Sequence, residues 1–196
     1  MQADFAVELG PGDETLEFPW RASGVLRYYD LKRQPELLLN IEEARQFPEL
    51  GEFLSAINST ASLLESAKCD AWSGTEISPE EEIFGAAWKF GSYVDLIFAS
   101  EQIRFSFQQH EQFARQITQL LQRAPEIPAA AETLIRRCYF HQDDGLREGF
   151  YFTFYLFGYG DDKEECRQRW AIALKLAENA MRQLSANSRT PGATRS

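Results

Sequence analysis

Apolar residues recur every three to four positions in three segments of the chain, which is the spacing of amphipathic helices. The most regular segment runs from Cys166 to Leu184, after the break at Gly158-Tyr159-Gly160. A shorter one spans Leu50 to Ile57, and a third spans Phe113 to Ala124, with Ser106 placed to cap its first turn. The pattern therefore predicts three helices, one of them at the end of the folded chain.

Alternation of apolar and polar residues predicts strands between these helices. Residues 133–141 and 147–157 alternate on either side of an Asp-Asp-Gly sequence at 143–145, which is typical of a β-hairpin turn. Three further strands are predicted over residues 66–72, 82–90 and 93–99, with Gly91-Ser92 as a tight turn between the last two.

From residue 48 the predicted order is α-β-β-β-α-β-β-α, after an irregular or β N-terminal segment. Antiparallel hairpins followed by helices predict an α+β fold, with an antiparallel sheet and helices packed on one face. We expect a single domain over residues 1–185, in which residues 1–45 are an N-terminal extension packing on it. Residues 186–196 contain no large apolar side chain, so we expect a disordered tail there.

The net charge of the chain argues against some classes of binding partner. The chain has 196 residues, with 20 Lys and Arg against 30 Asp and Glu, and a formal net charge of −10. Because an acidic surface repels phosphate backbones and anionic lipid, we expect neither a nucleic-acid partner nor a membrane partner. The most apolar segment, 150–157, is too short to span a bilayer as a helix. Three widely spaced cysteines and an acidic N-terminus without a signal-like apolar run indicate a cytoplasmic protein.

The strand over 147–157 carries aromatic residues on both sides. Alternation places Phe150, Phe152 and Phe154 on one side, which the helices would cover, and Tyr151, Tyr155 and Tyr159 on the other. Two interpretations of the tyrosine side stay open. Either the N-terminal extension folds over it as second-layer core, or it is a binding face for a second copy, another protein or a planar ligand. The candidate binding residues are Tyr151, Tyr155, Tyr159, Tyr139, Arg137, His141 and Trp88.

Catalytic signals are weak throughout the sequence. His141 stands next to Asp143 and Asp144, but a turn rich in Asp and Gly forms for its backbone geometry alone, so we assign no metal site there. The cysteines occupy positions where a small apolar residue is expected, and His110 has the polar neighbours of a surface residue. No phosphate-binding loop, nucleophile elbow or zinc-protease motif is present. We assign no catalytic residue and expect no cofactor.

The order of elements over residues 48–185, and above all the strand-turn-strand-helix around Asp143-Asp144-Gly145, resembles the type III secretion chaperone-like fold, which includes the YbjN family. The resemblance implies a small acidic protein that binds other proteins, commonly as a dimer, and it carries no catalytic residues over to this chain.

Two functions stay open on the sequence. The first is a non-enzymatic protein-binding module, either a chaperone-like adaptor or a subunit of a larger complex, which uses the aromatic sheet face to bind a protein partner or a second copy in a homodimer. The alternative is a small-molecule-binding protein or small enzyme with a pocket between sheet and helices. That pocket would be lined by Trp88, Tyr139, Tyr151 and Tyr155 and flanked by Arg137 and His141.

Overall fold

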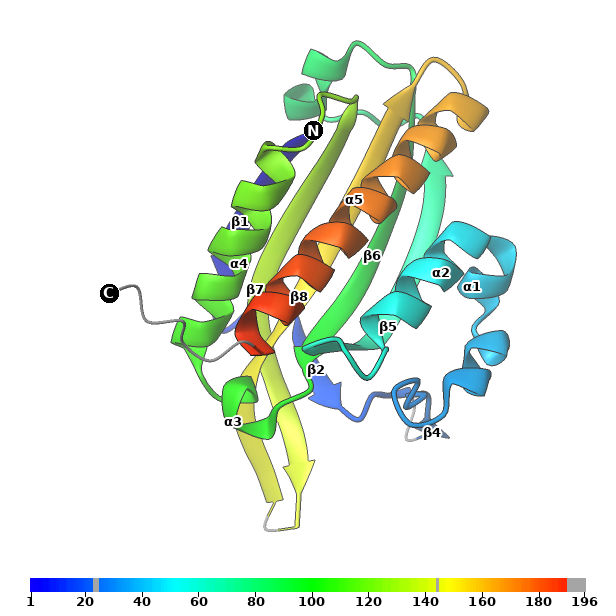
Figure 1. Cartoon of the computed structure of the whole chain (residues 1–196). Helices are drawn as coiled ribbons and strands as arrows, with labels where there is room; N and C mark the ends of the chain where they lie inside the picture. Colours follow the sequence, from blue (N-terminus) through cyan, green and yellow to red (C-terminus); the bar gives the residue numbers. More distant parts are fainter. Residues whose placement is uncertain (23–24, 144, 190–196) are drawn as a thin grey trace.

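The computed structural model describes residues 1–22, 25–143 and 145–189. A six-stranded sheet runs through it in the order β1-β7-β8-β6-β5, and β2 pairs with the part of β7 that β1 leaves free (Figure 1). β1 and β2 lie parallel to β7, while β7, β8, β6 and β5 pair antiparallel. The strands of this sheet are β1 (Gln2–Glu8), β2 (Thr15–Phe18), β5 (Leu64–Gly74), β6 (Trp88–Phe98), β7 (Ala129–Gln142) and β8 (Gly145–Gly160).

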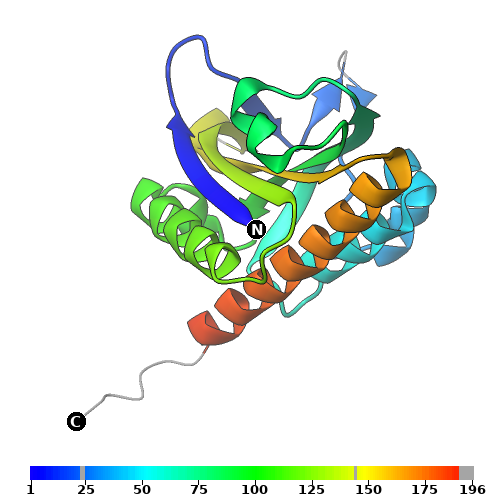
Figure 2. The same ribbon diagram turned by 90° about the horizontal axis from the view of Figure 1, so that it is seen from above.

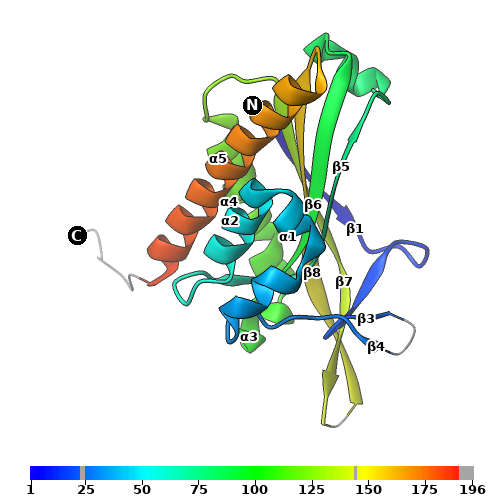
Figure 3. The same ribbon diagram turned by 90° about the vertical axis from the view of Figure 1, so that its right-hand side faces the viewer.

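The α-helices lie on one face of this sheet (Figure 3), whereas the short 3-10 helix of residues 79–84 contacts Tyr159 on the other face. Phe152 and Phe154 of β8 point into the layer between sheet and helices, where Phe152 meets Phe113 and Phe154 meets Phe53. The Trp170 indole is fully buried and its Nε1 donates to Ser92 Oγ at 2.8 Å. The α+β class and the helices on one face are therefore confirmed. The helical elements are η1 (Pro35–Asn40), α1 (Glu42–Gln46), α2 (Pro48–Ile57), η2 (Pro79–Phe84), α3 (Glu101–Arg104), α4 (Phe107–Gln122) and α5 (Lys163–Arg189).

The α5 helix crosses the sheet diagonally over β8 (Figure 2). Asp162 caps it, because its Oδ1 accepts from the backbone amides of Glu164 and Glu165 at 2.9 Å. The helix continues to Arg189, so residues 186–189, which we expected in the disordered tail, are helical. The rest of that expected tail, 190–196, lies outside the described residues.

The N-terminal extension supplies two edge strands. β1 pairs with β7 from Gln2 opposite Ala130, and the N-terminal amine donates to the carbonyl of Pro125 at 2.9 Å. A small separate ladder joins β3 (Arg21–Ala22) to β4 (Val25–Leu26). The extension is therefore part of the sheet as well as a cover for it.

The region between β5 and α3 differs from the prediction. Residues 82–90 and 93–99 were predicted as two strands joined at Gly91-Ser92, whereas β6 is one strand that passes straight through these two residues. A Cβ at Gly91 would lie 3.0 Å from the rings of both Phe157 and Trp72, so this glycine makes room for side chains of neighbouring strands. Residues 79–84 form the 3-10 helix η2. When the short helical turns are set aside, the order of helices and strands from residue 48 is α-β-β-α-β-β-α.

His110 is buried and not on the surface, which corrects the sequence interpretation. It is 0% exposed, and its ring lies against Phe98 and Phe152 with centroids 4.8 and 4.9 Å away. Its Nδ1 lies 2.9 Å from the Ser106 carbonyl oxygen. Burial lowers the pKa of His110 to about 4, so the ring is neutral near pH 7. Polar neighbours in sequence did not reveal this, because His110 faces the sheet one turn from Ala114.

No helix among the described residues is long and apolar enough to cross a membrane.

Candidate functional site

The face of the sheet opposite the helices, here called the helix-free face, carries the tyrosine side of β8. Because directly paired residues of neighbouring strands point to the same side, the register assigns each residue to a face. Tyr155 of β8 pairs with Glu132 of β7 and with Tyr93 of β6. Tyr93 in turn pairs with Asp70 of β5, and Glu132 with Asp4 of β1. One row of side chains thus crosses the whole sheet on this face.

The end of the helix-free face around Tyr151 is covered by the N-terminal extension. Tyr151 is 1% exposed and lies in a small hydrophobic cluster with Leu16 and Phe140. Phe18 packs on Phe140 with ring centroids 5.8 Å apart, and Trp20 lies at the border of the same cluster. Tyr151 is therefore a core residue and not a binding residue.

The opposite end, around Tyr159, is covered by η2. Phe84 stacks on Tyr159 with centroids 4.1 Å apart, and the Tyr159 hydroxyl donates to Glu81 Oε1 at 2.7 Å. Lys89 completes the contact through an ion pair with Glu81 at 3.0 Å. Burial acts to raise the pKa of Glu81, but the hydrogen bonds from Ser78, Tyr159 and Lys89 outweigh it and lower the pKa. Tyr159 is 1% exposed and is also a structural residue.

Between these covered ends four aromatic side chains stay partly exposed, and we call them the aromatic quartet: Trp72, Tyr93, Tyr155 and Phe157. Their ring centroids form a closed circuit. The distances are 6.4 Å from Trp72 to Tyr93, 5.9 Å from Tyr93 to Tyr155, 6.1 Å from Tyr155 to Phe157 and 6.2 Å from Phe157 to Trp72. The quartet spans three adjacent strands, so its position is fixed by the sheet and not by a loop.

A buried polar network adjoins one side of the quartet on the same face of the sheet. Asp95 is 2% exposed, and its Oδ1 accepts from the Thr153 hydroxyl at 2.8 Å. Arg136 donates to Thr153 Oγ1 at 3.1 Å and forms ion pairs with Glu8 at 2.7 Å and Glu14 at 3.1 Å. Burial raises the pKa of Asp95 to about 7, although the hydrogen bond from Thr153 acts in the opposite direction. The network ties the N-terminal extension to the centre of the sheet.

Four of the sequence-predicted site residues lie on the wrong side of the sheet for the tyrosine face. Arg137 pairs with Phe150, Tyr139 with Glu148 and His141 with Leu146, so all three share the side of Phe150. Arg137 donates to the Leu9 carbonyl and His141 Nε2 lies 3.3 Å from Glu17 Oε2.

Trp88 is the fourth. It pairs with Gly160 on the helix side, where the Lys163 ammonium lies 4.8 Å from the centre of its ring. Of the seven candidates, only Tyr155 belongs to the quartet.

Three quartet residues are absent from the candidate set: Phe157, which alternation within β8 puts on the side of Tyr155, and Trp72 and Tyr93, which lie on other strands. Trp72 ends the predicted strand 66–72. The face of the sheet on which its side chain lies could not be assigned without the register between β5 and β6. That register contains a bulge between Ser66 and Lys68, which reverses the alternation that a regular strand would have. The prediction placed Tyr93 directly after a turn at Gly91-Ser92, whereas β6 continues through these residues.

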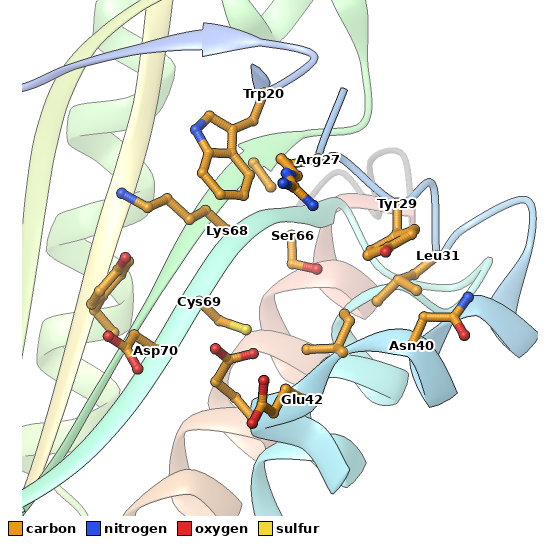
Figure 4. A pocket seen from close by; sticks show the side chains of 14 residues that line it. Trp20, Arg27, Tyr29, Leu31, Asn40, Glu42, Ser66, Lys68, Cys69 and Asp70 are labelled. Atoms are coloured by element: carbon orange, nitrogen blue, oxygen red, sulfur yellow. The ribbon is translucent and has the colours of Figure 1, made fainter. Parts of the chain in front are cut away.

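A cavity of about 460 Å³ adjoins the quartet at the outer edge of β5 (Figure 4). Tyr93 and Asp70 line both the quartet row and this cavity. In Figure 4, Trp20 and Lys68 lie at one side, Tyr29 and Leu31 at another, and Glu42 below. The side chains of its wall thus come from β5, from the segment after β2 and from α1. The cavity shares no residue with the pocket of the alternative function, which was expected to involve Trp88, Tyr139, Tyr151, Tyr155, Arg137 and His141.

The cysteines lack the features of a nucleophile. Cys138 is fully buried, and Cys69 lines the cavity at the side of β5. Burial raises the pKa of Cys69 to about 12, and nearby Glu43 and Asp70 raise it further, so the thiolate is scarce near pH 7. Within the described part of the chain, no three His, Cys, Asp or Glu side chains gather as metal ligands would.

Comparison with known proteins adds no relative from which a role could be transferred. The chain matches no protein-family model, no curated protein sequence and no solved structure.

Proposed function

We propose that this chain is a non-enzymatic protein-binding module, a chaperone-like adaptor or a subunit of a larger complex, which docks a protein partner on the aromatic quartet. One observation carries the proposal. The two ends of the helix-free face are covered by the N-terminal extension and η2, whereas the quartet between them is left partly exposed. A protein that covers both neighbours of an aromatic cluster and leaves the cluster open has a surface suited to recognition.

The side chains of the quartet suit protein recognition. Tyr and Trp are enriched where binding energy concentrates, since each presents a large rigid surface with a polar atom at its edge. A strand-borne platform loses little conformational entropy when a partner covers it. The proposal agrees with what the type III secretion chaperone-like resemblance implies, namely an acidic protein that binds other proteins. The cytoplasmic location expected from three unpaired cysteines is part of the same proposal.

A second copy of the chain fits the quartet less well than a different protein. The row through Tyr155 and Tyr93 ends in Asp4 and Glu132 on one side and Asp70 on the other. A face-to-face pairing that aligns the two rows brings carboxylates of one copy near carboxylates of the other, and like charges facing each other are unfavourable. We therefore favour a heterologous partner over the homodimer.

We expect the Tyr155→Ala variant to weaken partner binding by roughly 2 kcal/mol, or about thirtyfold, because truncating a central aromatic side chain removes most of its contact area. Its fold should persist at a cost of about 1 to 2 kcal/mol, since Tyr155 is already partly exposed. Native mass spectrometry of the protein isolated from its own host's extract at low salt measures the bound partner. Ile172→Ala is the matched control, because Ile172 is 49% exposed on α5 and lies on the other side of the molecule. A folded Tyr155→Ala protein that keeps its partner at the wild-type level contradicts the proposal.

The cavity beside β5 supports the second candidate function, binding of a small molecule. Its volume of about 460 Å³ lies in the range of ligand sites, and its wall combines aromatic and charged side chains. The same mass spectrum separates the two functions. A monomer that carries a small extra mass, and whose melting temperature rises with that compound, favours the cavity.

A further inference from the structure

We propose that the partner segment bound on the aromatic quartet is basic, and that its lysine or arginine side chains lie over Tyr155 and Trp72 between the carboxylates of Glu132 and Asp70. The inference rests on the proposed function and specifies the chemistry of the partner. It follows from two features of the quartet: the charges at the two ends of the row and the cations already on its rings.

The carboxylates at the ends of the row form no ion pair with a described side chain, although the Arg136 guanidinium attracts Glu132 from a longer distance. Asp4 accepts from the amide of Phe5 at 2.7 Å and Asp70 from the amide of Ala71 at 2.7 Å, and neither forms an ion pair there. Glu132 is exposed and makes no ion pair with a described side chain. Burial, and after it the neighbouring Glu8 and Asp4, raise the pKa of Glu132, while Arg136 acts in the opposite direction. A cation from a partner would reduce the repulsion among these carboxylates.

Two lysines of the chain itself already lie over rings of the quartet. Lys68 Nζ lies 5.4 Å from the ring centre of Tyr93, and Lys89 Nζ lies 5.7 Å from that of Phe157. Both ammonium groups are balanced by carboxylates, Lys68 by Glu14 at 3.8 Å and Lys89 by Glu81 at 3.0 Å.

Tyr155 and Trp72 differ from these two rings, because no cation of the described residues lies over either one. Ring faces of this kind attract ammonium and guanidinium groups, and more strongly when water is excluded on binding. The two rings are therefore the places on the quartet where a partner's cation fits.

The cavity beyond Asp70 has a wall of mixed charge, to which Glu42, Arg27 and Lys68 contribute (Figure 4). Since Glu132 on β7 and Asp70 on β5 are three strand spacings apart, about 14 Å separates their backbones. About four residues of extended chain cover that span, so a partner with two basic residues four positions apart could reach both ends of the row.

The test uses a defined probe in place of the natural partner. It is a labelled peptide in which two lysines stand four positions apart with three apolar residues between them, beside the same peptide with both lysines replaced by norleucine. Nuclear magnetic resonance of the full chain follows the Trp72 indole and the Tyr155 ring while each peptide is added. We expect the lysine peptide to shift both signals, with an affinity about tenfold higher than that of the norleucine peptide and falling with salt.

Two double variants with the same change in net charge provide the control. Asp70→Asn with Glu132→Gln should weaken the lysine peptide about tenfold. Glu52→Gln with Glu126→Gln, which neutralises exposed carboxylates away from the quartet, should change its affinity by less than about twofold. Equal affinity for the two peptides, equal effects of the two double variants, or no signal shift with either peptide overturns the inference. If the norleucine peptide binds as well as the lysine peptide and Tyr155→Ala abolishes both, docking on the quartet stands and only the basic character of the partner is lost.

Discussion

Replacing Gly158 with alanine is expected to lower the free energy of unfolding by on the order of 3 kcal/mol or more. A Cβ at this position would lie 2.2 Å from the backbone nitrogen of Trp170 and 2.3 Å from the carbonyl oxygen of Cys166. Both atoms belong to the backbone of α5, so no side-chain rotation relieves the overlap. Either the helix must move off β8 or the strand must bend, and each movement opens the layer between sheet and helix.

Denaturant unfolding of the wild type and of the Gly158→Ala variant measures this loss of unfolding free energy. Gly74→Ala is the matched control, since Gly74 also lies in a strand but the nearest atom to a new Cβ, the backbone nitrogen of Glu76, would be 3.9 Å away. We expect that control to stay within about 1 kcal/mol of the wild type. Equal stabilities of the Gly158 and Gly74 variants would show that α5 does not pack as closely on β8 as described.

The Asp95→Asn variant is expected to be more stable than the wild type near pH 8 and to differ little from it near pH 4. The folded-state pKa of Asp95 is raised to about 7, from about 4 in the unfolded chain, so the folded protein binds a proton that the unfolded chain releases between these values. The stability that this protonated group contributes is present below pH 4 and is lost as the pH rises through 7. Asparagine keeps a neutral acceptor for the Thr153 hydroxyl at every pH.

The difference between the two unfolding free energies should therefore grow from pH 4 to pH 7 and then level off at about 2 to 4 kcal/mol. Because both proteins share every other titrating group, the difference isolates Asp95. Unfolding curves at five or six pH values across this range measure it. If the difference between the two unfolding free energies is constant with pH, Asp95 is not held protonated in the folded protein.

The β7–β8 hairpin and α5 could be predicted from the sequence because their signals are local. Alternation on both sides of the 143–145 turn and a three-to-four spacing from Cys166 onward each reflect contacts with a single neighbouring layer. The pairing of the two strands was harder to fix. If the register between the two strands shifts by one residue, Arg136 and Arg137 exchange faces. The prediction put Arg137 on the tyrosine face, whereas it is Arg136 that pairs with Tyr151.

The quartet could be predicted only in part, since three strands contribute to it. Tyr155 and Phe157 follow from alternation within β8. Trp72 depends on the bulge in β5, and the continuity of β6 depends on Gly91 meeting side chains from two other strands. Such contacts between distant residues leave no periodic signal, and glycine followed by serine has the local preference of a turn. The cover at each end, from η2 and the N-terminal extension, is likewise set by tertiary contacts.

Site-specific photo-crosslinking tests the central claim most directly. A benzophenone amino acid replaces Tyr155 in one protein and Ile172 in another, and both are irradiated in the native extract. Docking on the quartet predicts one predominant protein product from position 155, absent from position 172 and diminished by Trp72→Ala. The same products from both positions, or no product from position 155, would contradict a binding role for the quartet.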